Sequence, residues 1–249
     1  MEDLDLLKYE KELYKEGYEL IAGTDEAGRG PLCGPVVAAA VILPKNYKLE
    51  GLNDSKQLSE KKRDKYFEII KKDAISYGIG IVDAKTIDEI NIYEASRKAM
   101  LEAISKLDVT PDFVLTDAMP LPMDNSKAII HGDALSLSIA AASVLAKVTR
   151  DEIMYELDKK YPEYGFKSHK GYPTKKHLEN IKKYDSLLDD EFGDKASDLR
   201  GKIVELEELI EKRENPSKVK ILLAELKNLA IGVSGSLIAS GIAAQIPLF

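Results

Sequence analysis

Cysteine is almost absent from this sequence, because Cys33 is the single residue of its type among 249. One cysteine cannot form an internal disulfide, and it cannot build a metal site from several thiolates. The start of the chain also lacks the basic region and apolar stretch of a secretory signal, because Met1 is followed by acidic residues. These absences favour a protein of the reducing cytoplasm.

Long hydrophobic runs are missing as well. Residues 229–244 carry no charge, but this stretch is shorter than a typical membrane span and is interrupted by glycines and serines. We therefore expect no membrane segment. Hydrophobic residues at 44% and charged residues at 32% are ordinary values for a globular chain with a substantial core.

Positive charge is also in deficit, because the net charge is −7 and phosphate contacts require lysine and arginine. The distribution matters more than the total. Residues 167–183 contain six lysines and one acid, with two histidines and Tyr172 between them and Phe166 directly before them. Charge alone favours a solvated helix face for this segment, and a nucleic-acid surface is the alternative.

Apolar patterning predicts a mixture of strands and helices. Short apolar runs bounded by glycine-rich turns indicate strands, and longer runs with helical spacing indicate helices. Strands come first as a group and then alternate with helices, which predicts an α/β fold with a mixed sheet flanked by helices. The expected strands are 20–24, 36–43, 75–82, 113–116 and 128–130. The expected helices are a segment ending near 19, then 59–72, 87–107 and 134–160.

Acidic residues stand at the ends of these elements. Asp25 and Glu26 close the first strand. Asp117 follows the 113–116 strand, and Asp133 comes directly before the long helix. Taken singly, each is a turn residue or helix cap, and Asp133 would cap a helix that begins at Ala134. As a set they can converge in one crevice and bind hard divalent cations, which suits a nuclease without a histidine or cysteine nucleophile.

The turn after the first acids is rich in glycine and proline. In Gly28, Arg29 and Gly30 the exposed amides can form an anion or hydroxyl site, and the arginine adds a fixed positive charge. The turn does not fit the dinucleotide fingerprint, which opens a helix with three spaced glycines. It also lacks the lysine and hydroxyl residue of a P-loop.

Several motifs together resemble the ribonuclease HII family, and the resemblance spans roughly residues 6–184. They occur in the family's order along the chain. The matching segments are Gly23 to Pro31, Asn53 to Ser59, Asn91 to Met100, Leu115 to Ala118, Gly132-Asp133, Ile139 to Asp151, Tyr164 to Phe166 and His169 to Thr174.

This resemblance implies an RNase H-like fold with a helical C-terminal extension. The implied catalytic and metal-binding residues are Asp25, Glu26, Asp117 and Asp133. The implied chemistry is hydrolysis with two Mg²⁺ or Mn²⁺ ions, one activating water and the other stabilising the leaving 3′ oxygen. The expected substrates are the RNA strand of RNA–DNA hybrids and duplex DNA nicked 5′ of embedded ribonucleotides, with 3′-hydroxyl and 5′-phosphate products. This activity belongs to ribonucleotide excision repair and DNA replication.

Substrate contacts also follow from the resemblance. Gly28, Arg29 and Gly30 are expected to grip the ribose 2′-hydroxyl, which distinguishes RNA from DNA. Tyr172 is expected to stack on the neighbouring deoxyribose. The expected phosphate contacts are Lys56, Lys147, Arg150 and Lys170.

Two alternatives compete with this interpretation. Ribonucleases of the HIII type share the sheet, but they typically lack the Gly-Arg-Gly turn and carry an N-terminal substrate-binding domain. Here the turn is present and the segment before it is short. A catalytically silent hybrid-binding module is the second alternative, and the retention of all the acids argues against it.

The chain departs from the family after Tyr184, where a usual basic ending is missing. We expect a catalytic domain over 1–186 and a tail over 187–249, with apolar spacing that predicts a helical hairpin over 198–231. A packing accessory is the preferred role of this tail. The last five residues resemble the peptide that docks bacterial repair proteins on the sliding clamp, through Gln245, Leu248 and Phe249. The alternative, which stays open, is that these apolar residues only pack on the surface of the hairpin.

Overall fold

The computed structural model describes residues 5–49, 51–52, 58–177 and 196–212, and the single positions 218, 221, 222 and 225. The strands are β1 (Ile21–Ala27), β2 (Val36–Ile42), β3 (Ser76–Val82), β4 (Phe113–Asp117) and β5 (Ser126–Ile129). The α-helices are α1 (Lys8–Lys15), α2 (Glu60–Asp73), α3 (Ala84–Ser105), α4 (Leu137–Lys160), α5 (Phe166–His169) and α8 (Ala196–Glu211). Two 3-10 turns are η2 (Gly132–Ala134) and η3 (Pro162–Tyr164).

The strands form one mixed sheet in the order β3-β2-β1-β4-β5. β1 pairs antiparallel with β2, and β2 pairs antiparallel with β3. β1 pairs parallel with β4, and β4 pairs parallel with β5. The expected mixed α/β sheet is therefore confirmed, and its parallel half contains the strand ends that carry the acidic residues.

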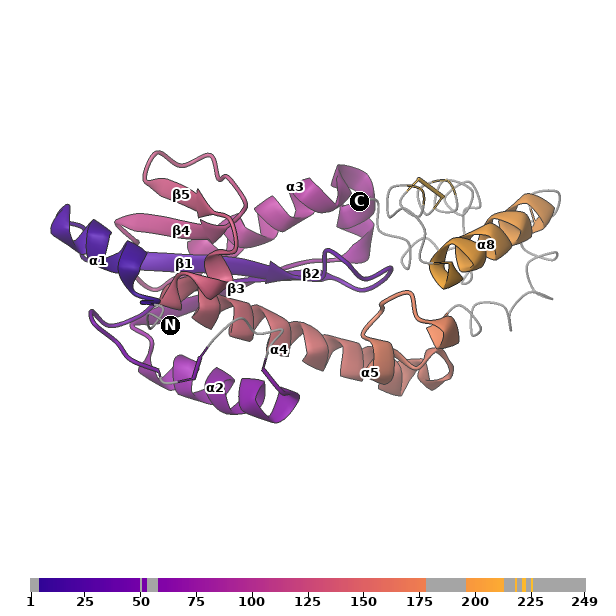
Figure 1. The fold of residues 1–249 in the computed structure, drawn as a ribbon, viewed down its shortest axis with the longest axis horizontal. Helices are drawn as coiled ribbons and strands as arrows, with labels where there is room; N and C mark the ends of the chain where they lie inside the picture. The colour runs from indigo at the N-terminus through magenta and orange to yellow at the C-terminus, as the bar shows by residue number, and fades with distance from the viewer. Residues whose placement is uncertain are drawn as a thin grey trace. The chain divides into compact units, whose positions relative to one another are not determined.

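Helices cover both faces of this sheet (Figure 1). On one face, Ala39 and Val41 of β2 pack in a core cluster with residues of α2 and of the first half of α4. On the other face, β3 passes so close to α3 that Cβ atoms at Gly78 and Gly80 would lie 2.1 Å and 2.0 Å from carbonyl oxygens of that helix. These glycines permit the close packing of α3 on the sheet.

Two helices differ in detail from the predicted ones. Asn91 has a positive φ of 68° inside α3, so the helix is kinked there. The side chain of Asn91 accepts hydrogen bonds from the amides of Tyr93 and Glu94, as a helix cap does. The long helix begins at Leu137 and not at Ala134, because Gly132–Ala134 forms a 3-10 turn. Asp133 is thus not its cap, and Ser136, whose Oγ accepts from the amide of Ile139, takes that place.

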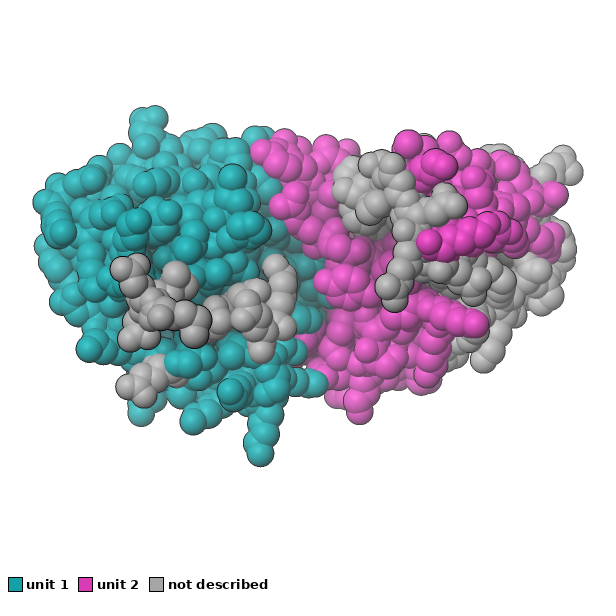
Figure 2. Space-filling view, viewed as in Figure 1, with its two compact units in different colours: residues 1–28, 36–82, 95–150 teal, residues 29–35, 83–94, 151–249 magenta. Residues whose placement is uncertain are grey.

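The chain divides into two compact units, which Figure 2 shows in different colours. Unit 1 contains residues 1–28, 36–82 and 95–150, and unit 2 contains residues 29–35, 83–94 and 151–249. Unit 1 therefore holds the sheet, with α1, α2 and the parts of α3 and α4 that pack on it. The boundary expected near residue 186 lies outside the described residues, so it stays a prediction.

The C-terminal extension is described mainly through α8. Leu199, Ile203, Leu206 and Ile210 have helical spacing and lie within this helix, as expected. The second helix of the expected hairpin lies largely outside the described residues, and so does the peptide 245–249. Within the described part of the chain, no helix combines the length and apolar character needed to cross a membrane.

Candidate active site

Parallel pairing of β1 with β4 brings the first two acids to the same end of the sheet. Thr24 pairs with Thr116, and Asp25 and Asp117 each follow one residue later on their strands. Side chains at equivalent positions of neighbouring parallel strands lie on the same face of the sheet. Asp25 and Asp117 are therefore neighbours because of strand register.

Asp133 reaches the same place from the turn before α4. This turn begins at His131, which has a left-handed φ of 57°, and it contains η2. The amide of Gly132 donates a 2.7 Å hydrogen bond to Oδ1 of Asp117. The turn is thus tied directly to the end of β4, and Asp133 is the next residue along.

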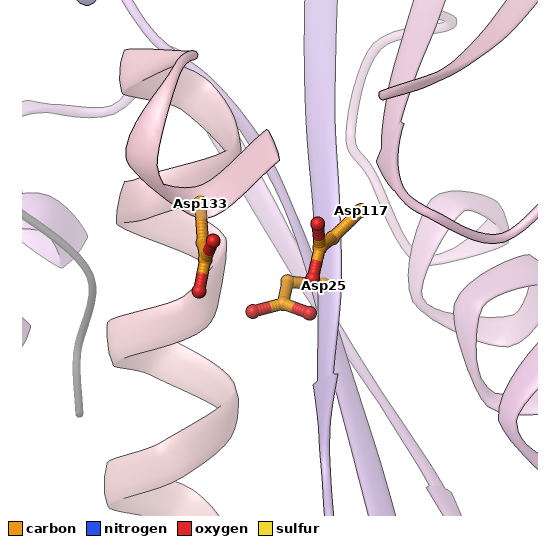
Figure 3. Close-up of side chains that lie close together, drawn as sticks. All are labelled: Asp25, Asp117 and Asp133. Carbon is orange, nitrogen blue, oxygen red and sulfur yellow. The ribbon is translucent and has the colours of Figure 1, made fainter. Parts of the chain in front are cut away.

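The three carboxylates form one cluster. Each of Asp25, Asp117 and Asp133 offers an oxygen, and these oxygens lie within 4.8 Å of one another. In Figure 3, Asp133 faces the other two across a short gap from the side of α4. Asp25 and Asp133 are buried, and Asp117 is partly exposed. An all-oxygen set with this spacing fits a hard divalent cation.

Glu26 is not a member of this cluster among the described acids. It follows Asp25 on β1, and successive strand residues point to opposite faces of a sheet. The pairing partner of Asp25 is Ala39, which packs on the α2 and α4 face, whereas Glu26 pairs with Ala38. Its amide donates a 2.7 Å hydrogen bond to Oδ1 of Asp25, so it still contacts the site through its backbone.

The pKa of Asp25 lies well above its ordinary value. Burial is the largest cause, followed by the negative charges of Glu26 and Asp117. Hydrogen bonds from the Ser143 side chain and the Glu26 amide act in the opposite direction. Buried carboxylates this close together repel one another, and a divalent cation would relieve the repulsion. The electrostatics of the residues therefore fit a metal site.

A second constellation lies within unit 2. The amide of Leu32 donates a 2.8 Å hydrogen bond to the carbonyl of Gly171, which joins the glycine-rich loop to the segment before Tyr172. A Cβ atom at Gly30 would lie 3.2 Å from Cε1 of the Tyr172 ring. Tyr172 remains 47% exposed. The loop and the tyrosine, which the sequence separates widely, thus share one surface.

Two buried histidines support this surface. The rings of His169 and His177 are stacked with centroids 4.3 Å apart. Nδ1 of His169 accepts from the amide of Gly171, and Nδ1 of His177 lies 3.0 Å from the carbonyl oxygen of Tyr172. Both histidines and Phe166 are buried, so they do not lie on a basic surface face as their interleaving with lysines suggested.

The expected phosphate contacts are placed unequally. Lys147 is partly exposed on α4. Arg150 is only 1% exposed, so its guanidinium is not presented to solvent as a direct phosphate contact requires. Nζ of Lys170 lies 4.0 Å from the centroid of the Tyr155 ring and donates to the carbonyl of Lys167. Lys56, like Gln245, Leu248 and Phe249, lies outside the described residues.

Sequence reasoning missed the supporting residues of the acid cluster. Ser143 lies in the family-like segment Ile139 to Asp151, but its hydrogen bond to Asp25 depends on how α4 packs on β1. The sequence shows Gly132 as the neighbour of Asp133, but it does not show that the Gly132 amide donates to Asp117. A Cβ atom at Gly132 would lie 2.6 Å from Cδ1 of the buried Ile139, so the end of that side chain would have to shift to admit any other residue.

Comparison with known proteins places this fold and site in a family. The model of the family described as Ribonuclease HII matches residues 22–189. A ribonuclease HII of Acetivibrio thermocellus is 59% identical over 183 residues, which cover 73% of this chain and 72% of the relative.

Solved structures agree with this match. The crystal structure of the ribonuclease H2 from Pyrococcus horikoshii has a TM-score of 0.59 and 29% identity, covering 68% of this chain and 88% of that chain. The ribonuclease HII in a complex with PCNA from Archaeoglobus fulgidus has a TM-score of 0.54 and 25% identity, covering 67% and 89%. With its mixed sheet, its acid cluster and these matches, the chain belongs to the ribonuclease HII family.

Proposed function

We propose that this chain is an endoribonuclease that hydrolyses the RNA strand of RNA–DNA hybrids and nicks duplex DNA 5′ of embedded ribonucleotides. Family membership supports the reaction class. The single observation that carries the site assignment is the meeting of Asp25, Asp117 and Asp133 within 4.8 Å. Products with 3′-hydroxyl and 5′-phosphate ends belong to the same proposal.

The three aspartates would hold the divalent cations, and we propose Mg²⁺ or Mn²⁺ for this role. Bound there, such ions supply Lewis acidity and lower the pKa of a coordinated water. Glu26 is proposed as a further ligand, because its negative charge raises the pKa of Asp25. Its side chain starts from the face of the sheet opposite that of Asp25. Burial of Asp25 and Asp133 limits access of bulk water, which strengthens electrostatic interactions at the scissile phosphate.

The Gly30 and Tyr172 surface is proposed to recognise the ribonucleotide. The amides of Gly28, Arg29 and Gly30 would bind the 2′-hydroxyl, and Tyr172, which is exposed, would stack on the next sugar. The arginine is exposed on the same loop and would contact a phosphate. Lys147 and Lys170 are the remaining proposed phosphate contacts, together with Lys56. For Arg150, burial argues instead for a role inside the protein.

Docking on a DNA sliding clamp is proposed for the last five residues. A glutamine followed by Leu248 and Phe249 suits a groove with a polar rim and an apolar pocket. The Archaeoglobus fulgidus relative was solved in a complex with PCNA, which supports a clamp as partner for this family. A clamp would raise the local enzyme concentration at newly incorporated ribonucleotides. We place this activity in the cytoplasm, as the near absence of cysteine favours.

Cleavage of a duplex that contains one ribonucleotide tests the proposal. The products are mapped to the nucleotide, with Mg²⁺, with Mn²⁺ and with a chelator present. We expect one metal-dependent nick 5′ of the ribonucleotide and a 3′-hydroxyl end. Binding without any cut under all metal conditions would instead identify a silent hybrid-binding module.

A further inference from the structure

A buried carboxylate outside the acid cluster lies on α1. Glu10 is only 3% exposed, and its Oε1 accepts three hydrogen bonds. The donors are Oγ of Ser136 at 2.6 Å, Oγ of Ser138 at 2.7 Å and the amide of Ser138 at 3.1 Å. Oε2 is also buried and has no hydrogen-bond partner among the described residues. Burying a carboxylate is costly, so a position that retains one calls for an explanation beyond packing.

All three hydrogen-bonding groups belong to the start of α4. The first amides of a helix lack partners within the helix and need other acceptors. The amide of Leu137 donates to the carbonyl of Leu6 at 2.8 Å, and that of Ser138 donates to Glu10. The amide of Ile139 donates to Oγ of Ser136, which itself donates to Glu10. The segment around α1 therefore holds the first turn of α4.

The other side of this turn rests on β1. A Cβ atom at Gly23 would lie 2.2 Å from the carbonyl carbon of Ser138 and 2.3 Å from the amide nitrogen of Ile139. Ser138 is thus fixed between the Glu10 carboxylate and the backbone of β1. Asp25 lies two residues after Gly23 on the same face of that strand. The position of the first turn of α4 on β1 therefore determines how close the residues before α4, including Asp133, come to Asp25.

A short chain of hydrogen bonds links this turn to the acid cluster. The amides of Leu135 and Ser136 donate to the carbonyl of Gly132 at 3.0 Å and 2.8 Å. The amide of Gly132 in turn donates to Asp117. Asp133 lies between these hydrogen-bonded residues, so we expect a displacement of Ser136 to shift the backbone of Asp133.

We propose that Glu10 is a positioning residue for the metal site, acting through Ser136 and Ser138 to hold Asp133 against Asp25 and Asp117. This role rests on the proposed metal-dependent function. Supporting residues behind metal ligands set the orientation of those ligands. A carboxylate is also the kind of side chain that suits the positive N-terminal end of the 24-residue helix α4.

The Mn²⁺ affinity of the full chain tests this role. It is measured by calorimetry or from the EPR signal of free Mn²⁺, at a temperature at which every variant is folded. Glu10→Gln keeps the shape and removes the charge, and Glu12→Gln makes the same change at an exposed position of α1. We expect Glu10→Gln to weaken Mn²⁺ binding roughly tenfold and Glu12→Gln to leave it unchanged. Without metal, the Ser138 amide should exchange its hydrogen faster in Glu10→Gln.

A double-mutant cycle with Asp133→Asn separates positioning from general stability. If Glu10 acts through Asp133, Glu10→Gln has no further effect on Mn²⁺ affinity in the Asp133→Asn chain. Ser138→Ala, which removes one donor to Glu10, should weaken Mn²⁺ binding in the same direction and serves if Glu10→Gln does not fold. Loss of stability with unchanged Mn²⁺ affinity would overturn the positioning role alone. A wild-type chain that binds Mn²⁺ no better than Asp25→Asn would overturn the proposed metal site itself.

Discussion

Gly23 and Ser138 touch backbone to backbone, because a Cβ atom at Gly23 would lie 2.2 Å from the carbonyl carbon of Ser138. Gly23→Ala must push α4 away from β1. We expect a loss of folding free energy of roughly 3 kcal/mol or more, measured by denaturant unfolding. The variant should also lose Mn²⁺ affinity, because the same displacement separates Asp133 from Asp25.

Gly201→Ala is the matched control for this substitution. Gly201 lies in α8, and a Cβ atom there would meet nothing within 4 Å. Alanine is the better helix former by about 1 kcal/mol, so this change should preserve or increase stability. Equal destabilisation by both substitutions would show that the close contact at Gly23 does not decide the result.

The second prediction concerns acid stability through His177. Burial and the neighbouring His169 lower the pKa of His177 to about 4, against 6.5 for the unfolded chain. The unfolded state therefore gains a proton between pH 6.5 and 4 that the folded state resists. The contribution of the neutral histidine to the free energy of unfolding is therefore fully present above pH 6.5. It decreases as the pH is lowered from 6.5 to 4, by at most about 3 kcal/mol.

Melting temperatures between pH 7 and 5 check this effect. His177→Asn keeps a donor near the carbonyl of Tyr172 and removes the titrating ring, so its melting temperature should depend less on pH than that of the wild type. His131→Asn serves as control, because His131 is exposed and already has a left-handed backbone that asparagine tolerates. A wild-type pH dependence retained in His177→Asn would contradict the assignment.

Tyr172 supplies the third prediction. Tyr172→Ala removes the exposed ring beside Gly30 and should slow cutting at an isolated ribonucleotide more than cutting within a long RNA tract. Rates on the two substrates are compared for this variant and for Tyr93→Ala, another exposed tyrosine of unit 2. Equal losses on both substrates in Tyr172→Ala would reject a role in junction recognition.

The fourth prediction concerns the C-terminal peptide. Deletion of residues 245–249 should abolish binding to a bacterial sliding clamp, with an intact-chain Kd on the order of micromolar because the peptide must order on binding. Nuclease activity on short free duplexes should survive the deletion. If both chains bind the clamp equally, or neither binds, the docking proposal is rejected.

Much of the fold was predictable because period-two and period-3.6 apolar patterns are local properties of the chain. The predicted strands correspond to the observed ones with small shifts at their ends, and the mixed order followed from where the helices begin to alternate. The start of α4 was misplaced, because Asp133 is as good a cap by composition as Ser136. Only the tertiary contact with Glu10 and Leu6 decides between them.

The site was partly predictable for the same reason. Strand-end acids could be found in the sequence, since parallel strands present their ends at one edge. Adjacent positions on a strand already place Asp25 and Glu26 on opposite faces. Which of the two faces α4, and the burial of Arg150, depend on tertiary packing. Neither property leaves a mark in local sequence spacing.

The central claim is that the aspartate cluster binds the catalytic metal ions. Measuring cleavage and hybrid binding separately in aspartate variants tests it most directly. Asp25→Asn and Asp117→Asn each remove a proposed metal ligand and leave the basic residues intact, and Asp124→Asn makes the same change at an exposed turn of unit 1. We predict that both site variants lose cleavage of a duplex with one ribonucleotide, while their hybrid affinity stays within roughly tenfold of the wild type. Asp124→Asn should cut normally. Robust cleavage by Asp25→Asn or Asp117→Asn would contradict the account.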